Sequence, residues 1–150
     1  MKNIKPELIA LLKKGSCTPR ISKLAARTHS KATTIHYNIK QMESQGVIKT
    51  YKAVFDYKKI DAGFCTFVLV NLDRKEYKSP EDIGSILTEY PEIESIDIIT
   101  GEWEMLLKVR TKDIDKYYEF SKKVLSLSGI AKTQSLNSLF QIKTEFVKMQ

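Results

Sequence analysis

The stretch LAARTHSKATTIHYNIKQMESQGVIKTYKAVFD, residues 24–56, decides how the first part of the chain folds. It is predicted to contain the end of one short helix, a turn of three or four residues and then a longer helix. Apolar residues recur along the longer helix at the spacing of one helical face: Ile35, Ile39 and Met42. Gly46 is a favourable helix stop, and the apolar residues 47–48 that follow it are typical of a chain that packs back after such a stop. The pattern predicts two helices joined by a tight turn.

Another helix precedes this pair. Pro6 suits a first helical turn because its missing N–H would have no partner there, and Gly15 suits the stop. An apolar stripe lies between them, formed by Leu8, Ile9, Leu11 and Leu12. Three short helices with basic and polar residues on the last one predict a helix-turn-helix domain over residues 1–50, followed by a linker strand and hinge over 51–62.

Charge is distributed unevenly along the chain, whose formal net charge is +7. Residues 1–60 contain 13 Lys and Arg against 3 Asp and Glu, a net +10, while residues 61–150 contain 12 against 15, a net −3. Such a one-sided block predicts a polyanionic partner, double-stranded DNA above all. A solvated basic face without a specific partner is the plainer alternative. A membrane surface fits less well, because no strongly apolar face with Trp or Phe accompanies the charge.

The third helix carries the candidate DNA contacts on the side opposite its apolar face. Its hydroxyl, imidazole, phenol and ammonium groups can donate to phosphates or meet base edges in a major groove. The candidates are Thr33, Thr34, His36, Tyr37 and Lys40, with Arg20, Lys31 and Lys40 as the phosphate contacts. The alternative is an ordinary wet helix face. A metal site at His36 is disfavoured, because His29 is seven residues away and no Cys or carboxylate joins them.

The rest of the chain alternates strands and helices. Residues 64–72 form an expected strand in which both alternate sets of side chains are apolar. A helix start is expected at Ser79–Asp82, followed by strands at Ile93–Thr100 and Trp103–Arg110. A second helix is indicated by an apolar stripe of Ile114, Tyr117, Tyr118, Val124 and Leu125, and a last strand is expected at Ile130–Ile142. The order βαββαβ predicts an α+β, ferredoxin-like domain over residues 63–150. One layer of helices covers one face of the first strand, so a second copy of the chain, in a homodimer, is the simplest cover for the other.

Residues 24–56 also resemble the helix-turn-helix and exit strand of the Lrp/AsnC, or feast–famine, transcriptional regulators. The matching positions are Leu24, Ala25, Ile35, Ile39, Met42, Glu43, Gly46, Val47 and Ile48. Four positions depart from the family pattern: His29 replaces Gly, Ser30 replaces Leu, Lys31 replaces the Ser N-cap and Asn38 replaces Arg. Histidine is enriched at positive φ, so the turn is expected to survive. Either Ser30 caps the third helix one residue early or the cap is missing.

The second half resembles the ligand-responsive RAM domain of the same family. IITGEWEMLLKVRTKDIDKYYEF, residues 98–120, is similar to its T-G-x-(Y/F/W)-D turn with the next strand and helix, and SGIAKTQSLNSLFQIK, residues 128–143, to its final strand. Glu104 replaces the usual Asp. The resemblance implies a cytoplasmic transcriptional regulator that dimerises through this domain, forms higher oligomers of dimers and binds an amino acid or related small molecule near the turn.

The expected effector site comprises Thr100, Gly101, Trp103 and Glu104, with Ser135 as a weaker member. Backbone N–H groups around Gly101 would hold a carboxylate, and Glu104 an ammonium group. The plainer alternatives are a hairpin glycine, a solvated Glu104 and, favoured for Trp103, a place in the core.

Other classes of function fit less well. The chain offers no catalytic triad, Cys–His pair, phosphate loop or metal cluster, so we expect neither an enzyme nor a cofactor. Cys17 and Cys65 form no C-x-x-C pair, and the start of the chain lacks signal-peptide features, which favours a reducing cytoplasm. No apolar run approaches the roughly 20 residues that span a membrane. The remaining rivals are an architectural DNA-binding protein with weak sequence preference and an enzyme-associated small-molecule-binding module. The ratio of specific to random DNA affinity separates the first from a regulator.

Overall fold

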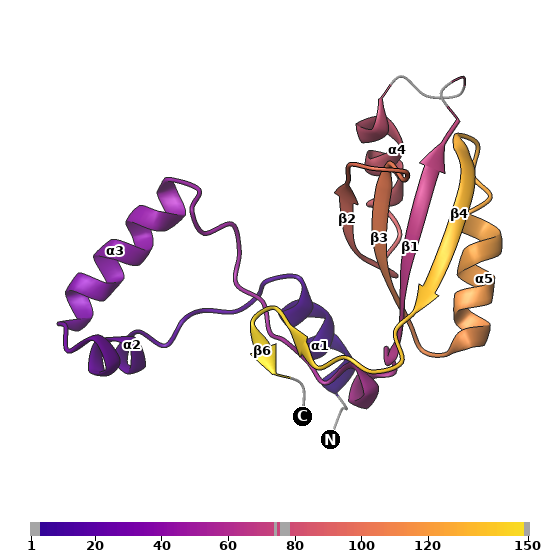
Figure 1. Ribbon diagram of the computed structural model, residues 1–150. Coiled ribbons are helices and arrows are strands. Elements are labelled where there is room, and N and C mark those ends of the chain that lie inside the picture. The colour runs from indigo at the N-terminus through magenta and orange to yellow at the C-terminus, as the bar shows by residue number, and fades with distance from the viewer. Residues whose placement is uncertain (1–3, 74, 76–78, 149–150) are drawn as a thin grey trace. The chain divides into compact units, whose positions relative to one another are not determined.

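The structure, a computed structural model, describes residues 4–73, 75 and 79–148. The chain forms two compact units, Met1–Val54 and Phe55–Gln150. The first contains three helices, α1 (Lys5–Lys13), α2 (Ile21–Thr28) and α3 (Ala32–Ser44), as expected (Figure 1). Helices α2 and α3 pack against each other across a turn in which His29 adopts a φ of 50°. The prediction that histidine would sustain this left-handed turn is confirmed.

Helix α3 begins without a side-chain cap. Its N-cap residue is Lys31, and the Ser30 hydroxyl donates instead to the carbonyl of Thr28 at 3.1 Å. Of the two alternatives, the missing cap is therefore the one observed.

The C-terminal end of α1 forms hydrogen bonds with the segment that follows α3. The Ala53 N–H donates to the Leu12 carbonyl at 3.3 Å, and Ser16 forms a parallel bridge with Tyr51. Gly15, at a φ of +97°, allows this approach, because a Cβ there would lie 2.2 Å from Thr50 Oγ1. Among residues 4–54, only Ile39 is buried. A single chain therefore gives its helical unit almost no core.

The second unit is the expected ferredoxin-like domain. After a short 3-10 helix, η1 (Tyr57–Ile60), its elements are β1 (Phe64–Leu72), α4 (Pro80–Leu87), β2 (Ile93–Ile98), β3 (Met105–Thr111), α5 (Ile114–Val124) and β4 (Ile130–Asn137). The antiparallel strands lie in the order β2-β3-β1-β4, with β1 paired to β3 and β4 (Figure 1). A short hairpin of β5 (Lys143–Thr144) and β6 (Val147–Lys148) follows.

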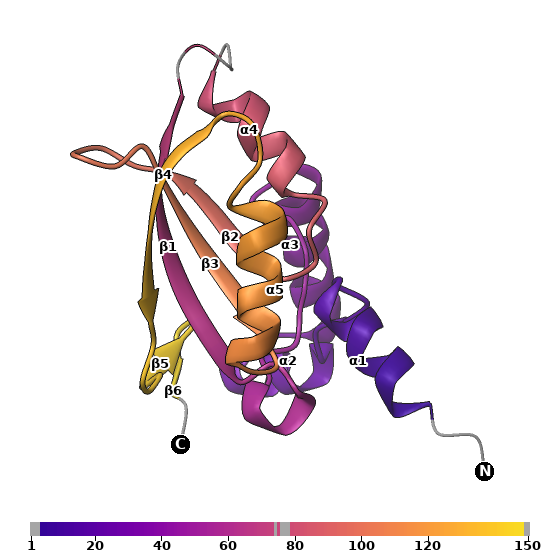
Figure 2. The same ribbon diagram turned by 90° about the vertical axis from the view of Figure 1, so that its right-hand side faces the viewer.

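Helices α4 and α5 lie on the same side of this sheet (Figure 2). The core lies between them and one face of the sheet, where Val68 pairs with Leu107 and Val70 with Met105. Helix α4 starts with a capping box in which Ser79 and Asp82 satisfy each other's backbone N–H groups. At one end of the opposite face of the sheet, Cys65 and Arg110 are buried beside residues 138–141. The rest of this opposite face carries Phe67, Leu69, Leu106, Lys108 and Leu136, and no helix of the unit covers it. We call it the open face.

Three expectations about this unit are wrong. Trp103 is half-buried and lies outside the core, because β3 begins only at Met105. Helix α5 buries Tyr117, Phe120 and Val124, whereas Ile114 and Tyr118 are 59% and 61% exposed. The last strand ends at Asn137 rather than Ile142. Beyond the hydrogen bond from the Ser138 N–H to the Cys65 carbonyl, only Phe64 of β1 remains, so residues 140–142 have no partner in β1.

Helix α4 allows a matched test of this packing, because Ile83 is 6% exposed and Ile86 is 51% exposed on the same helix. We expect Ile83→Ala to lower the free energy of unfolding by ~2–5 kcal/mol, since it leaves a cavity in the core. Ile86→Ala should cost under ~1 kcal/mol. Urea unfolding of both variants measures this. Equal losses would mean that α4 presents a different face to the sheet.

Candidate nucleic-acid interface

The outward face of α3 gathers most of the predicted DNA contacts. Residues three, four and seven positions apart share one side of a helix, and this relation holds for Thr33, His36, Tyr37 and Lys40. All four are exposed, Tyr37 by 67%. Together with Ile21 and Ala32 they line one shallow, open hollow. Sequence reasoning missed Ile21 and Ala32, because an apolar residue at a helix start gives no sign of lining a polar face.

Thr34 lies outside this hollow. It is exposed, and its carbonyl accepts a hydrogen bond at 2.8 Å from the Asn38 side chain, which stands where the family pattern has Arg. Asn38 is therefore directed back along its own helix.

Arg20 and Lys31 occupy equivalent places, as the N-cap residues of α2 and α3, and both are exposed. Neither helix start has a side-chain cap. Backbone N–H groups and cationic side chains thus occur together at both helix starts, an arrangement that suits phosphate oxygens.

Lys40 has an acidic neighbour on its own helix. Its Nζ lies 3.2 Å from Glu43 Oε2, and the Tyr51 hydroxyl donates to Glu43 Oε1 at 3.1 Å. The hydrogen bonds from Lys40 and then Tyr51 lower the pKa of Glu43, while desolvation and the bond to Glu43 raise the pKa of Tyr51. A phosphate at Lys40 must compete with this carboxylate.

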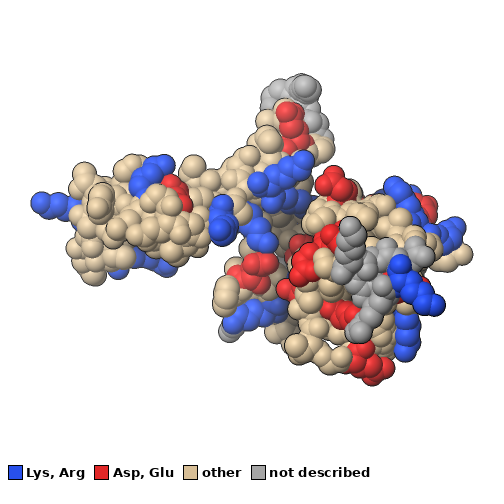
Figure 3. Space-filling model, turned by 90° about the horizontal axis from the view of Figure 1, so that it is seen from above, with Lys and Arg blue, Asp and Glu red and all other residues tan. Residues whose placement is uncertain are grey.

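The helical unit is otherwise short of acidic groups, since Glu7 and Glu43 are the only ones among residues 1–54. On the face seen in Figure 3, acidic side chains gather over the ferredoxin-like unit, at the right, and Lys and Arg dominate the charges of the helical unit. The basic potential therefore belongs to the unit that carries α3.

The predicted effector residues divide into two places. Thr100 and Gly101 are exposed in the turn between β2 and β3, where Gly101 has a φ of +116° and an added Cβ would meet nothing within 4 Å. Trp103 and Glu104 follow directly and are half-buried. Ser135 faces the helices instead, where its hydroxyl is hydrogen-bonded to that of Tyr117. The structure therefore does not bring Ser135 to the turn.

Glu104 is held in place by the neighbouring strand. Its Oε2 accepts the Leu72 N–H at 2.8 Å, and its own N–H donates to the Val70 carbonyl and to Asn71 Oδ1, both at 3.1 Å. It is thus not the solvated charge of the plainer alternative. Lys132, which the sequence did not single out, places its Nζ 4.8 Å from the centre of the Trp103 ring. The turn therefore presents an anionic and a cationic group beside an aromatic ring.

Comparison with known proteins agrees with this architecture. The family described as "Lrp/AsnC ligand binding domain" matches residues 65–147. The HTH-type transcriptional regulator FL11 of Pyrococcus furiosus is 30% identical over 138 residues, covering 91% of this chain and 87% of the relative.

Two solved structures share the fold. An AsnC family transcriptional regulator from Agrobacterium tumefaciens is 25% identical, with a TM-score of 0.73 and coverage of 96% of this chain and 94% of that one. A Neisseria meningitidis transcriptional regulator, solved in complex with L-Met, is 23% identical, with a TM-score of 0.76 and coverage of 96% and 93%.

A helix-turn-helix unit followed by a ferredoxin-like ligand-binding domain defines a class of transcriptional regulators. The chain belongs to the Lrp/AsnC family of that class, as its sequence led us to expect. The family consists of regulators and not enzymes, which sets the enzyme alternative aside. Within the described residues, no helix is long and apolar enough to cross a bilayer.

Proposed function

We infer that the chain is a sequence-specific DNA-binding regulator that inserts α3 into a major groove. The observation that carries this proposal is the exposed set of Thr33, His36, Tyr37 and Lys40 on one face of α3, in the unit that holds the excess positive charge. Thr33, Thr34, His36 and Tyr37 would meet base edges, while Arg20, Lys31 and Lys40 would position the helix on phosphates.

The protein that binds DNA is proposed to be a homodimer. Phe67, Leu69 and Leu136 lie on the open face, and Leu136 is 45% exposed. The helical unit also exposes apolar side chains: Leu8 and Leu11 of α1 are 46% and 48% exposed, and Val47 is 67% exposed. Exposed apolar side chains gathered on one face mark an interaction site, and each unit supplies such side chains. A two-fold dimer would read palindromic half-sites one helical turn, ~10–10.5 bp, or a multiple apart.

The proposed effector is an amino acid bound at the turn. Its carboxylate would meet the backbone N–H groups near Gly101 and the ammonium group of Lys132, and its own ammonium would meet Glu104, whose carboxylate oxygens accept several hydrogen bonds. Because the turn and α3 belong to different units, the effector would act by changing assembly or the relative pose of the units.

The rival proposal is an architectural DNA-binding protein. It needs the same basic face but no base contacts, so it predicts equal affinity for selected and random DNA. The hydroxyl, imidazole and phenol groups on α3 favour the regulator, because besides donating to phosphates they can form hydrogen bonds with base edges.

The DNA proposal is tested by titration of selected and random duplexes at several salt concentrations. We expect Lys40→Ala to weaken every sequence alike and to reduce the slope of log affinity against log salt by ~0.9. His36→Ala and Thr34→Ala should instead change which sequence is preferred. Lys122→Ala, a cation of α5, is the control and should leave the slope unchanged. Binding that ignores salt, or no binding by the full chain, would overturn the proposal.

Sedimentation at micromolar concentration tests the dimer. The full chain should sediment as a dimer or larger, and Leu69→Glu should raise its dissociation constant at least about tenfold, since the burial of an unpaired charge is costly. Ile114→Glu places the same charge on the exposed side of α5 and should have no effect. A monomeric full chain contradicts the proposal.

Calorimetric titration of the twenty amino acids tests the effector site. At least one should bind, and Glu104→Gln should weaken it about tenfold, because glutamine keeps an acceptor for the Leu72 N–H but loses the charge. Glu102→Gln in the same turn is the control. By linkage, a ligand that tightens DNA binding must itself bind tighter when DNA is present. If no amino acid binds, or Glu104→Gln changes nothing, the effector assignment fails while the DNA proposal stands.

A further inference from the structure

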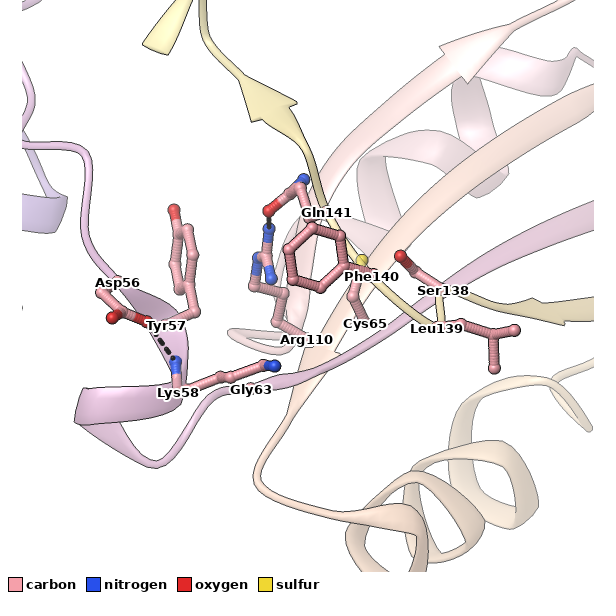
Figure 4. A pocket seen from close by; sticks show the side chains of 10 residues that line it. All are labelled: Asp56, Tyr57, Lys58, Gly63, Cys65, Arg110, Ser138, Leu139, Phe140 and Gln141. Carbon is pink, nitrogen blue, oxygen red and sulfur yellow. Dashed lines mark hydrogen bonds between the residues drawn. The ribbon is translucent and has the colours of Figure 1, made fainter. Parts of the chain in front are cut away.

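A second cavity lies at the far end of the sheet from the effector turn, where β1 begins and β3 ends (Figure 4). It measures about 220 Å³ and belongs wholly to the second unit. Its walls come from η1, from β1 and β3, and from the stretch after β4. Its lining includes Tyr57, Lys58, Cys65, Arg110, Phe140 and Gln141.

Arg110 is the central group of this cavity. Its side chain is only 8% exposed, and three contacts hold it in place. Its Nε pairs with Glu94, its Nη2 donates to Gln141 Oε1 at 2.8 Å, and its guanidinium carbon lies 3.6 Å from the centre of the Tyr57 ring. A guanidinium has five N–H donors, and the hydrogen bonds within the described chain use two of them. The group is thus fixed in position with donors to spare.

The electrostatic balance around the cavity is positive. Glu94 is shared between Arg110 and Lys108, whose Nζ lies 3.1 Å away, so one carboxylate faces two cations. Glu94 does not itself line the cavity, and the carboxylate that does, Asp56, accepts the Lys58 N–H at 3.3 Å and pairs with Lys59 at 3.4 Å. Burial raises the pKa of the Cys65 thiol, which keeps that group uncharged. The excess of positive charge around the cavity favours the binding of an anion.

Lys58 adds a second cation at the same opening. Its Nζ lies 5.6 Å from the centre of the Phe140 ring, and its stem passes close to Gly63. A Cβ on Gly63 would lie 3.1 Å from Lys58 Cγ, so the absence of a side chain there allows this position.

Most of the remaining wall is apolar or aromatic, with Tyr57, Leu139, Phe140 and the neutral thiol of Cys65, and Ser138 adds one hydroxyl group. An apolar protein cavity of ~150 Å³ is known to accept benzene, so about 220 Å³ accommodates a ring together with a carboxylate. The phosphates of a nucleotide would bring more negative charge and volume than this cavity can match.

We propose that this cavity binds a small organic carboxylate with an apolar or aromatic body, its carboxylate between Arg110 and Lys58 and its body against Tyr57 and Phe140. This site is separate from the turn at Gly101 and rests on the proposed function only for its regulatory meaning. Tyr57 and Lys58 begin three residues after Val54, the end of the DNA-binding unit. A ligand here therefore touches the segment that joins the two units.

Phenylacetate is a suitable probe, and phenylacetamide is its neutral counterpart of the same shape. By calorimetry with the full chain, phenylacetate should bind and phenylacetamide should bind at least about tenfold more weakly. Lys58→Gln should weaken phenylacetate about tenfold. Lys59→Gln, the adjacent residue whose side chain is 81% exposed, should not.

The thiol of Cys65 shows whether binding occurs in this cavity. In a Cys17→Ser background Cys65 is the only cysteine, and phenylacetate should slow its alkylation by iodoacetamide at saturating concentration. Overturning results are no binding of phenylacetate, equal affinity for phenylacetamide, or binding that leaves Cys65 unprotected and is lost in Glu104→Gln. The last result places the ligand at the turn, which refutes this cavity and leaves the proposed effector site intact.

Discussion

Strand β1 is apolar on both faces and hydrogen-bonded along both edges, and the rest of the second unit is arranged around that constraint. Pairing with β3 and β4 satisfies its backbone, and α4 and α5 cover the face that holds Val68 and Val70. The face that holds Phe67 and Leu69 stays open in one chain. Because a half-covered sheet exposes apolar surface to water, this face is the physical basis of the proposed homodimer.

The helical unit depends on its surroundings in another way. Its helices form where helix stops and apolar spacing predict them, yet in one chain only Ile39 is buried among the residues described there. Most helical stability in proteins comes from the packing of an amphipathic face. A helical unit with so small a core of its own would be sensitive to the proposed assembly, and this would give the proposed effector in the other unit a physical means of control.

The two ends of the sheet differ in chemistry. At one end, Glu104 is bonded to β1 and lies beside the Trp103–Lys132 pair, which suits a ligand with both charges. At the other end, the nearby carboxylates are already paired with cations, so Arg110 and Lys58 leave an excess of positive charge. This excess suits an anion with an apolar body. The proposed zwitterion and the proposed carboxylate therefore need not compete for one site.

Local pattern alone determined the helices, the bounds of β1, the βαββαβ order, the left-handed turn at His29 and the exposed polar face of α3, because each depends on residues close together in the sequence. Contacts between distant residues decided the rest. Trp103 lies outside the core because β3 starts two residues later, and the Glu104 carboxylate accepts the Leu72 N–H of β1. Ser135 is hydrogen-bonded to Tyr117, and β4 ends close to the residue at which β1 begins. The cavity around Arg110 joins four separate segments, and no periodicity within any one of them predicts a guanidinium buried among the other three.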